Sequence, residues 1–197
     1  MEISKNLNLV IPVSRTDGST VHVFSTPISR TVFEKYYFVL AKTFNSIWSG
    51  GLSITAGPRV AALLLRDTAK QMNQWDGQEG VEQGLVAEMR RLTNVLVNEQ
   101  NKGWVPIPLQ EAITRGILDE DDASEVENAL AFFTVASHMH RKAERKELLQ
   151  SAMGIWGAQV TLSGLMEYSN SLLTSTMPAN TGASAPEPAS QVSSIPY

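Results

Sequence analysis

The chain has 197 residues, and its 16 Lys and Arg against 20 Asp and Glu give a formal charge of −4. With 43% hydrophobic residues it has enough apolar side chains for a core, and its length suits a single domain. The lack of cysteine excludes disulfides, iron–sulfur clusters, thiolate zinc sites and cysteine nucleophiles. The mild acidity disfavours nucleic acid as the main partner, because phosphate binding requires concentrated Lys and Arg.

No segment of the sequence predicts secretion or membrane insertion. The N-terminus lacks the uninterrupted apolar core of a signal peptide. The longest apolar run, residues 60–65, is far shorter than the roughly 20 residues that span a bilayer. We therefore expect a soluble protein of the cytoplasm that contacts neither membrane nor nucleic acid.

The strongest strand signal lies in residues 5–28. Apolar and polar side chains alternate along residues 7–14, residues 16–18 favour a turn, and residues 20–24 are rich in β-branched and aromatic types. This pattern predicts a β-hairpin. Pro12 cannot donate a ladder hydrogen bond, so its strand is expected at a sheet edge or with a bulge.

Two loop lengths are compatible with this hairpin, and they give different registers. A two-residue loop would place Val13 opposite His22. A three-residue loop places Val13 opposite Val21 and Ile11 opposite Val23, which joins the apolar side chains on one face. We predict the three-residue loop with its glycine in a left-handed bulge, because a slip of one residue would divide that face.

After Pro27 the apolar residues recur at three- and four-residue spacing, which is typical of amphipathic helices. Ser29 or Thr31 is expected to cap the first helix, and Gly50 with Gly51 to end it. The predicted helices cover residues 29–48, 58 to about 74, 81–97, 109–117, 119–141 and about 162–172, with a loop at 98–108.

The helix predicted over residues 119–141 has the clearest signals. Acidic residues crowd its start and basic residues lie at or beyond its end, an arrangement that matches the helix macrodipole. Its apolar arc is too wide for one buried face, which predicts a central helix covered on more than one side.

Together these elements predict an α+β fold that is predominantly α-helical, with an N-terminal hairpin followed by five to six helices. Residues 1–173 are expected to form one globular domain. Residues 174–197 are rich in Pro, Ser and Ala and are expected to form a flexible tail, because they have too few apolar side chains to fold alone.

No catalytic or metal-binding motif stands out in the sequence. His138 and His140 lie about 200° apart around a helix, so their side chains should diverge, with one packed and one in solvent. The acidic run at residues 119–122 lacks the later ligands of a calcium loop and is explained by helix capping. Phosphate loops and nucleophile elbows are also missing. We therefore expect no cofactor and a non-enzymatic function.

The first predicted helix carries an unusually aromatic stripe along one side. It has two interpretations, which are core packing and contact with a partner protein. The aromatic residues assigned to a candidate partner-binding surface are Phe33, Tyr36, Tyr37, Phe44 and Trp48. Phe38 is a further aromatic residue of this segment that could lie at the surface and cover a partner helix.

Several short strings of the sequence point to one family. They are residues 25–30 (STPISR), 56–63 (AGPRVAAL), 88–96 (EMRRLTNVL), 125–129 (EVENA), 132–137 (FFTVAS), 156–159 (WGAQ) and 171–176 (SLLTST). In these strings and in the general character of its sequence, the chain resembles the tail assembly chaperones of long-tailed, siphovirus-type bacteriophages.

The resemblance implies a viral protein that acts in the host cytoplasm and is absent from the mature virion. Such chaperones bind the tape-measure protein and keep its apolar helices soluble until tail-tube subunits replace them. Many are also made in a longer, frameshifted version whose extension recruits the tail tube protein, and a flexible tail would suit that junction.

Two other functions stay open at this stage. One is a structural virion protein, such as a tail or head–tail completion subunit, and the other is an enzyme with a carboxylate-based site. A homo-oligomer built by strand pairing is a further expectation, because an isolated two-stranded hairpin is only marginally stable.

Overall fold

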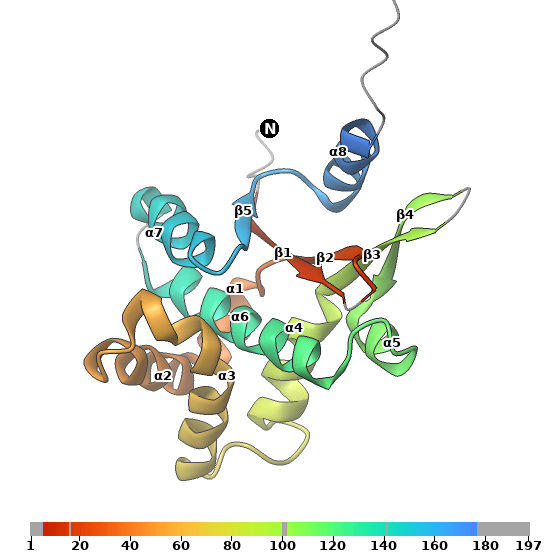
Figure 1. Ribbon diagram of the computed structural model, residues 1–197. Helices are drawn as coiled ribbons and strands as arrows, with labels where there is room; N and C mark the ends of the chain where they lie inside the picture. Colours follow the sequence, from red (N-terminus) through yellow and green to blue (C-terminus); the bar gives the residue numbers. More distant parts are fainter. Residues whose placement is uncertain (1–5, 16, 100–101, 141, 177–197) are drawn as a thin grey trace, which may run out of the picture.

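The computed structural model describes residues 6–15, 17–99, 102–140 and 142–176 (Figure 1). One antiparallel sheet has the strand order β4-β3-β2-β1-β5. The elements in chain order are β1 (Asn8–Ser14), β2 (Thr20–Ser25), α1 (Arg30–Lys35), α2 (Tyr37–Ser49), α3 (Ser53–Gln71), the π-helix η1 (Val81–Val86), α4 (Ala87–Arg91), β3 (Thr93–Glu99), β4 (Gly103–Pro108), α5 (Leu109–Thr114), α6 (Glu120–Met139), α7 (Lys142–Gly154), β5 (Gln159–Thr161) and α8 (Leu165–Thr176).

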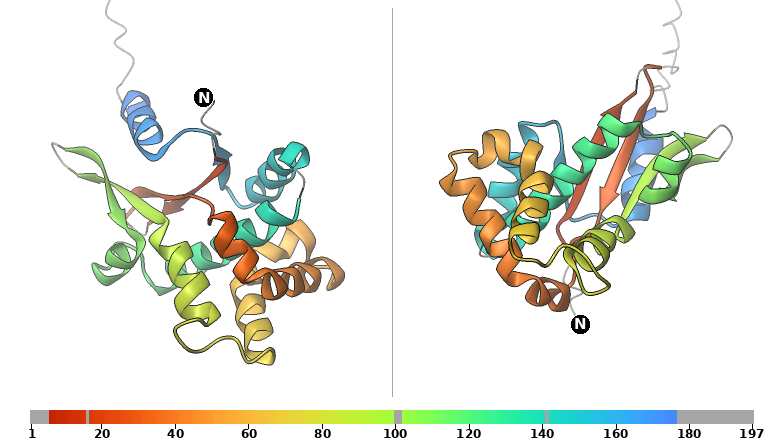
Figure 2. Two further views of the ribbon diagram at one scale, coloured as in Figure 1. Left: turned by 180° about the vertical axis from the view of Figure 1, so that it is seen from behind. Right: turned by 90° about the horizontal axis from the view of Figure 1, so that it is seen from below.

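Helix α6 lies at the centre of the molecule, between the sheet and the other long helices. It packs on one face of the sheet, while α2 and α3 pack on the side of α6 that faces away from the sheet (Figure 2). Helix α8 lies on the opposite face of the sheet, beside β4 (Figure 1). The predicted α+β fold, predominantly helical with an N-terminal hairpin, is confirmed.

The hairpin has the predicted register. Val13 pairs with Val21 and Ile11 pairs with Val23. The Arg15 amide donates to the Ser19 carbonyl at 2.8 Å, so three residues form the loop, and Gly18 adopts φ of 80°. That left-handed conformation favours glycine, which explains why the turn selects it.

The sequence predicts a sheet edge or a bulge for the strand of Pro12, but β1 lies inside the sheet, between β2 and β5. Strand β5 pairs with β1 only along Asn8–Val10, so beside Pro12 the strand has β2 on one side and no strand on the other. The missing amide of Pro12 therefore costs the sheet no hydrogen bond. Because β3 and β5 flank the hairpin within its own chain, the stability argument for a strand-paired homo-oligomer no longer applies.

The helix predicted over residues 81–97 and the loop predicted over 98–108 are both wrong in part. The helix ends at Arg91, and β3 follows, in which Val95 pairs with Val23 of the hairpin. Leu92 and Leu96 mimic helical spacing, but the β-branched residues between them fit a pleated strand. Pro106 and Pro108 suggested a loop, yet they lie in β4, an edge strand that tolerates proline.

Other helix boundaries differ from the predictions as well. The first predicted helix is divided at Tyr36 into α1 and α2, while Ser29 caps α1 by accepting from the Val32 amide. The basic segment after α6 begins the separate helix α7. These two differences give eight α-helices in the described part of the chain in place of the expected five to six. Residues 174–176 continue α8, and the rest of the predicted tail, 177–197, lies outside the described residues.

The sequence suggested that Pro58 occupies the first position of its helix. In the structure it lies inside α3, which begins at Ser53. The missing amide of Pro58 leaves the Ile54 carbonyl, one turn earlier, without its helical donor. The indole of Trp156 lies 3.4 Å from this oxygen and donates to it. The guanidinium of Arg59 also lies over the Trp156 ring, at 4.2 Å. Trp156, about 100 positions away in sequence, thus supplies the hydrogen bond that the Ile54 carbonyl loses to the proline.

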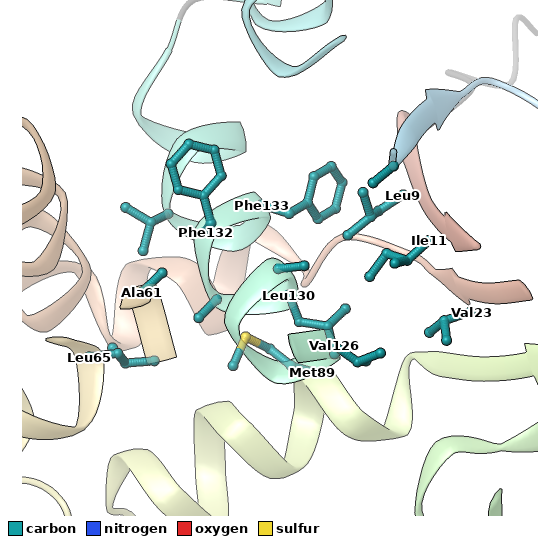
Figure 3. Close-up of a cluster of buried hydrophobic side chains, with 14 of the residues drawn as sticks. Leu9, Ile11, Val23, Ala61, Leu65, Met89, Val126, Leu130, Phe132 and Phe133 are labelled. Atoms are coloured by element: carbon teal, nitrogen blue, oxygen red, sulfur yellow. The ribbon is translucent and has the colours of Figure 1, made fainter. Parts of the chain in front are cut away.

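Eleven residues of α6 are buried, which confirms the prediction of a central helix. Asp119 caps its start in a reciprocal pair with Asp122. Phe133 points toward Leu9 of the sheet, whereas Phe132 points to the α2 and α3 side (Figure 3). The adjacent phenylalanines therefore join the two halves of the core.

The contact of α3 with α6 predicts the effect of two glycine substitutions. A Cβ added at Gly57 would lie 2.8 Å from the Phe132 ring and 2.9 Å from Ile47, both fully buried. We expect Gly57→Ala to lower the free energy of unfolding by about 1–3 kcal/mol, because the core must shift to accept it. Urea denaturation followed by circular dichroism measures this.

Gly154→Ala is the matched control for that experiment. Gly154 also lies in a helix, but a Cβ there would meet no atom within 4 Å. We expect this substitution to leave stability unchanged or to raise it by up to about 1 kcal/mol. Equal effects of the two substitutions would contradict the role assigned to Gly57.

Candidate partner-binding surface

The sequence-predicted aromatic residues lie along α1 and α2, where these helices meet the C-terminal end of α6. Most of their rings form two groups of contacts, one with His138 of α6 and the other with His140, the residue that directly follows α6. We call this surface the aromatic belt. It consists of Phe33, Tyr37, Phe38, Phe44, Trp48, His138 and His140.

The first part of the belt is its most exposed part. Phe33 is half-buried and stacks on His138, with ring centroids 4.6 Å apart. Tyr37 contacts Phe33 edge-on and is 45% exposed. Phe38 contacts Tyr37 and is 73% exposed, the largest value among the large apolar side chains of the described residues. These three rings present apolar surface that no part of the described chain covers.

The second part of the belt is more deeply packed. Phe44 and Trp48 stack at 4.1 Å, and Trp48 stacks in turn on buried Phe132 at 5.7 Å. His140 lies near both rings, at 5.5 and 5.9 Å. Phe44 and Trp48 therefore support the core and expose only part of their surface.

Tyr36 does not belong to the belt, although the sequence grouped it with the others. It is buried, and its hydroxyl lies 3.2 and 3.3 Å from the carbonyl oxygens of Glu79 and Gly80. The same hydroxyl fills the space where a Cβ of Gly84, in the π-helix η1, would lie. Tyr36 thus anchors the break between α1 and α2 to a distant loop.

His138 in α6 and His140 just after it are both half-buried, which corrects the expectation of one packed and one solvated ring. His138 is half-buried, and its Nδ1 lies 2.9 Å from the Ser137 hydroxyl and 3.1 Å from the Thr134 carbonyl. Burial lowers the pKa of His138 below its usual value. The imidazole rings of His138 and His140 contact different aromatic residues, Phe33 and Phe44. Among the described residues, no group of three His, Cys, Asp or Glu side chains could hold a metal ion.

The Arg145 guanidinium lies beside this end of α6. Its Nη2 donates to the His140 carbonyl at 3.2 Å, and burial lowers the pKa of the guanidinium. A cation at a helix C-terminus interacts favourably with the macrodipole. Arg145 therefore stabilises the turn that places the His140 ring in contact with Phe44 and Trp48. Arg141, which the sequence assigned to the same basic cluster, lies outside the described residues.

A groove of about 370 Å³ lies between α3, the η1–α4 segment and the first half of α6. Its floor includes the buried apolar residues Leu65, Met89 and Leu130. Its rim is charged and includes an ion pair between Arg90 and Glu127. Apolar floors with polar rims are typical of sites that accept helices or other apolar groups.

The sequence identified most of the belt but missed its two histidines and the groove. Phe38 follows two other aromatic residues, and only the break at Tyr36 shows that it faces solvent. His138 lies in a helix far along the chain and His140 directly follows that helix, so no local pattern joined them to α2. The groove is formed by three segments that are separate in sequence.

Within the described residues, no helix combines the length and apolar character that a membrane crossing requires. Comparison with known proteins adds no relative, since no family model, curated protein or solved structure matches the chain.

Two half-buried histidines, His22 and His138, predict how stability depends on pH. Burial lowers the pKa of both His138 and His22, so near the ordinary value of about 6.5 the unfolded chain binds more protons than the folded one. Their contribution to stability is therefore present above that value and is lost as the pH falls below it. We expect urea midpoints to fall between about pH 7.5 and about pH 5.5.

His138→Gln should reduce this fall, because it removes one of the two titrating rings. His22→Gln with His138→Gln should reduce it further than either single change. A fall that is identical in the double variant and the unaltered chain would show that other groups control it.

Proposed function

We propose that this protein is a bacteriophage tail assembly chaperone. It binds the tape-measure protein in the host cytoplasm and keeps its apolar helices soluble until tail-tube subunits assemble on them. The chaperone does not enter the mature virion. The family strings of the sequence support this proposal, and the exposed aromatic belt supplies a physical means of binding.

The observation that carries the proposal is the exposure of Tyr37 and Phe38 beside Phe33. Contiguous aromatic surface is unfavourable in water, and rings of this kind anchor protein interfaces. Covering a side chain the size of Phe38 contributes about 1.5–3 kcal/mol. Since tape-measure helices are apolar, they would gain the same free energy by leaving water, which favours transient association.

The groove between α3 and α6 is a second surface of the right chemistry. Leu63, on its rim, is 61% exposed, and charged side chains surround the apolar floor. Leu63 therefore offers a control that resembles Phe38 in exposure but lies outside the belt. Comparison of variants at Phe38 and Leu63 therefore tests which of the two surfaces, the aromatic belt or the groove, binds the client.

Co-expression with the long helical protein encoded downstream tests the function. We expect the unaltered chain to raise the soluble fraction of that client, and Phe38→Ser to weaken binding by about tenfold. Both Phe38→Ser and Leu63→Ser should change the free energy of unfolding by less than about 0.5 kcal/mol, because both side chains are exposed. Sedimentation of the client and binding titrations with the purified chain measure these effects.

The Leu63→Ser variant should bind the client as the unaltered chain does. Loss of binding in Leu63→Ser alone would assign the client to the groove. A client equally soluble with and without the chain would overturn the chaperone function itself.

A second candidate, a structural virion protein, is distinguished by mass spectrometry of purified particles, since the chaperone should be absent from them. A longer product that contacts the tail tube protein is also part of the proposal. A slippery heptamer near the end of the reading frame, followed by an overlapping open frame, would support it. The homo-oligomer expected from the sequence stays a prediction, and light scattering of the purified chain tests it.

A further inference from the structure

The groove between α3, the η1–α4 segment and α6 follows the faces of helices. On α6 its lining runs from Glu120 to Ala131 with helical spacing, which covers about three turns or about 16 Å of one helix face. On the η1–α4 segment Glu82, Val86 and Met89 line it at intervals of four and three residues. The groove is therefore long enough for about three turns of a helix.

Small side chains on the α6 wall keep this space open above an apolar floor. Ala123 and Ala131 line the wall, and the floor consists of Leu65, Met89 and Leu130, one from each of the three segments (Figure 3). The volume of about 370 Å³ is several times smaller than a helix of three turns, which is about 10 Å wide. A helix that binds here therefore lies over the opening and inserts only its apolar side chains.

The rim of the groove has more acids than bases. Arg90 donates through two of its nitrogens to Glu127, so the charges of this pair cancel. Glu82 and Glu120 remain, against the single base Arg66, and in the part of the chain that the structure describes neither glutamate forms an ion pair. Residues 119–127 add to the negative potential, because they include six acids and no base. The rim thus attracts cations.

The π-helix on one wall is an independent feature of this groove. Glu82 and Val86 of η1 line the groove, whereas Gly84 between them lies against the Tyr36 hydroxyl, which fills the space of a Cβ. π-Helices are rare and occur frequently at functional sites. A rare helix form therefore positions one of the two unpaired glutamates at the groove.

We infer that the groove binds a basic amphipathic helix of another protein. Large apolar residues of this helix, at positions i, i+3 or i+4 and i+7, enter the groove and cover its floor. Lys or Arg side chains on the flanks of the helix face Glu82 and Glu120. The inference goes beyond the chaperone function and does not depend on it, because it concerns the chemistry of the groove alone.

Another protein is favoured over a second copy of this chain as the source of the helix. The large apolar side chains exposed on the described helices are Tyr37 and Phe38 on α2, Leu63 on α3 and Met166 on α8. No described helix therefore exposes such residues at i, i+3 or i+4 and i+7. The net charge of −4 also opposes the approach of a second copy to an acidic rim.

The test uses the full chain and two fluorescent helical peptides that have leucine at the same positions. One peptide has lysine at the flanking positions and the other has glutamate, and anisotropy titrations should find the lysine peptide at least about tenfold tighter. Leu63→Ser removes an apolar side chain of the groove and should weaken the lysine peptide about tenfold. Phe38→Ser is the matched control, because Phe38 is equally apolar and exposed but lies outside the groove.

Charge variants separate recognition at the rim from attraction to the whole chain. Glu82→Gln with Glu120→Gln should weaken the lysine peptide at least about fivefold and reduce the salt dependence of its binding. Glu125→Gln with Glu147→Gln changes the net charge by the same amount, but neither residue lines the groove, so the affinity should stay unchanged. All four side chains are exposed, and urea denaturation should find both variants as stable as the unaltered chain.

Several results would overturn this inference. Equal affinity for the two peptides, or equal weakening by the two glutamate pairs, would show that the rim does not select a basic helix. Weakening by Phe38→Ser without weakening by Leu63→Ser would assign the peptide to the aromatic belt. A dimer of the unaltered chain that the lysine peptide dissociates would identify a second copy as the occupant. These peptide experiments contain no client, so they can fail while the co-expression experiment succeeds, and the reverse.

Discussion

The burial of adjacent phenylalanines on α6 is the constraint on which the rest of the fold depends. Phe132 and Phe133 point to different sides of one helix, so each requires its own apolar layer. The hairpin and its neighbouring strands supply one layer, and α2 with α3 supply the other. The second layer approaches closely only because Gly57 has no side chain. The side-chain oxygen of Asn128 also accepts a hydrogen bond from the Ala62 amide of α3, at 3.0 Å.

The aromatic belt is a consequence of this arrangement. Helix α2 packs against α6, so rings on their shared side are partly buried and those beyond it are exposed. The break at Tyr36 decides which ring falls on which side. Its hydroxyl is held at the carbonyls of Glu79 and Gly80, and this contact lets Phe38 face the solvent. The candidate binding surface therefore depends on a loop that does not belong to it.

The two faces of the sheet have different physical characters. The face against α6 belongs to the main core, where apolar side chains fill the space between strands and helices. The opposite face has a small apolar cluster, several hydrogen bonds and the buried indole of Trp104, whose Nε1 has no partner among the described residues. Regions with few buried apolar contacts open at lower free energy than cores do.

The sequence alone determined the elements whose signals are local. Alternation and a glycine turn fixed the hairpin register, and terminal charges with a wide apolar arc identified α6 as the central helix. Where the local pattern was ambiguous, or where the interacting residue lay far away in sequence, only the tertiary structure decided which element formed. Residues 93–99 became a strand because β2 offered an edge to pair with, and Pro58 was accepted inside α3 because Trp156 satisfies the freed carbonyl. Both depend on contacts between residues far apart in sequence, which the periodicity of one segment does not contain.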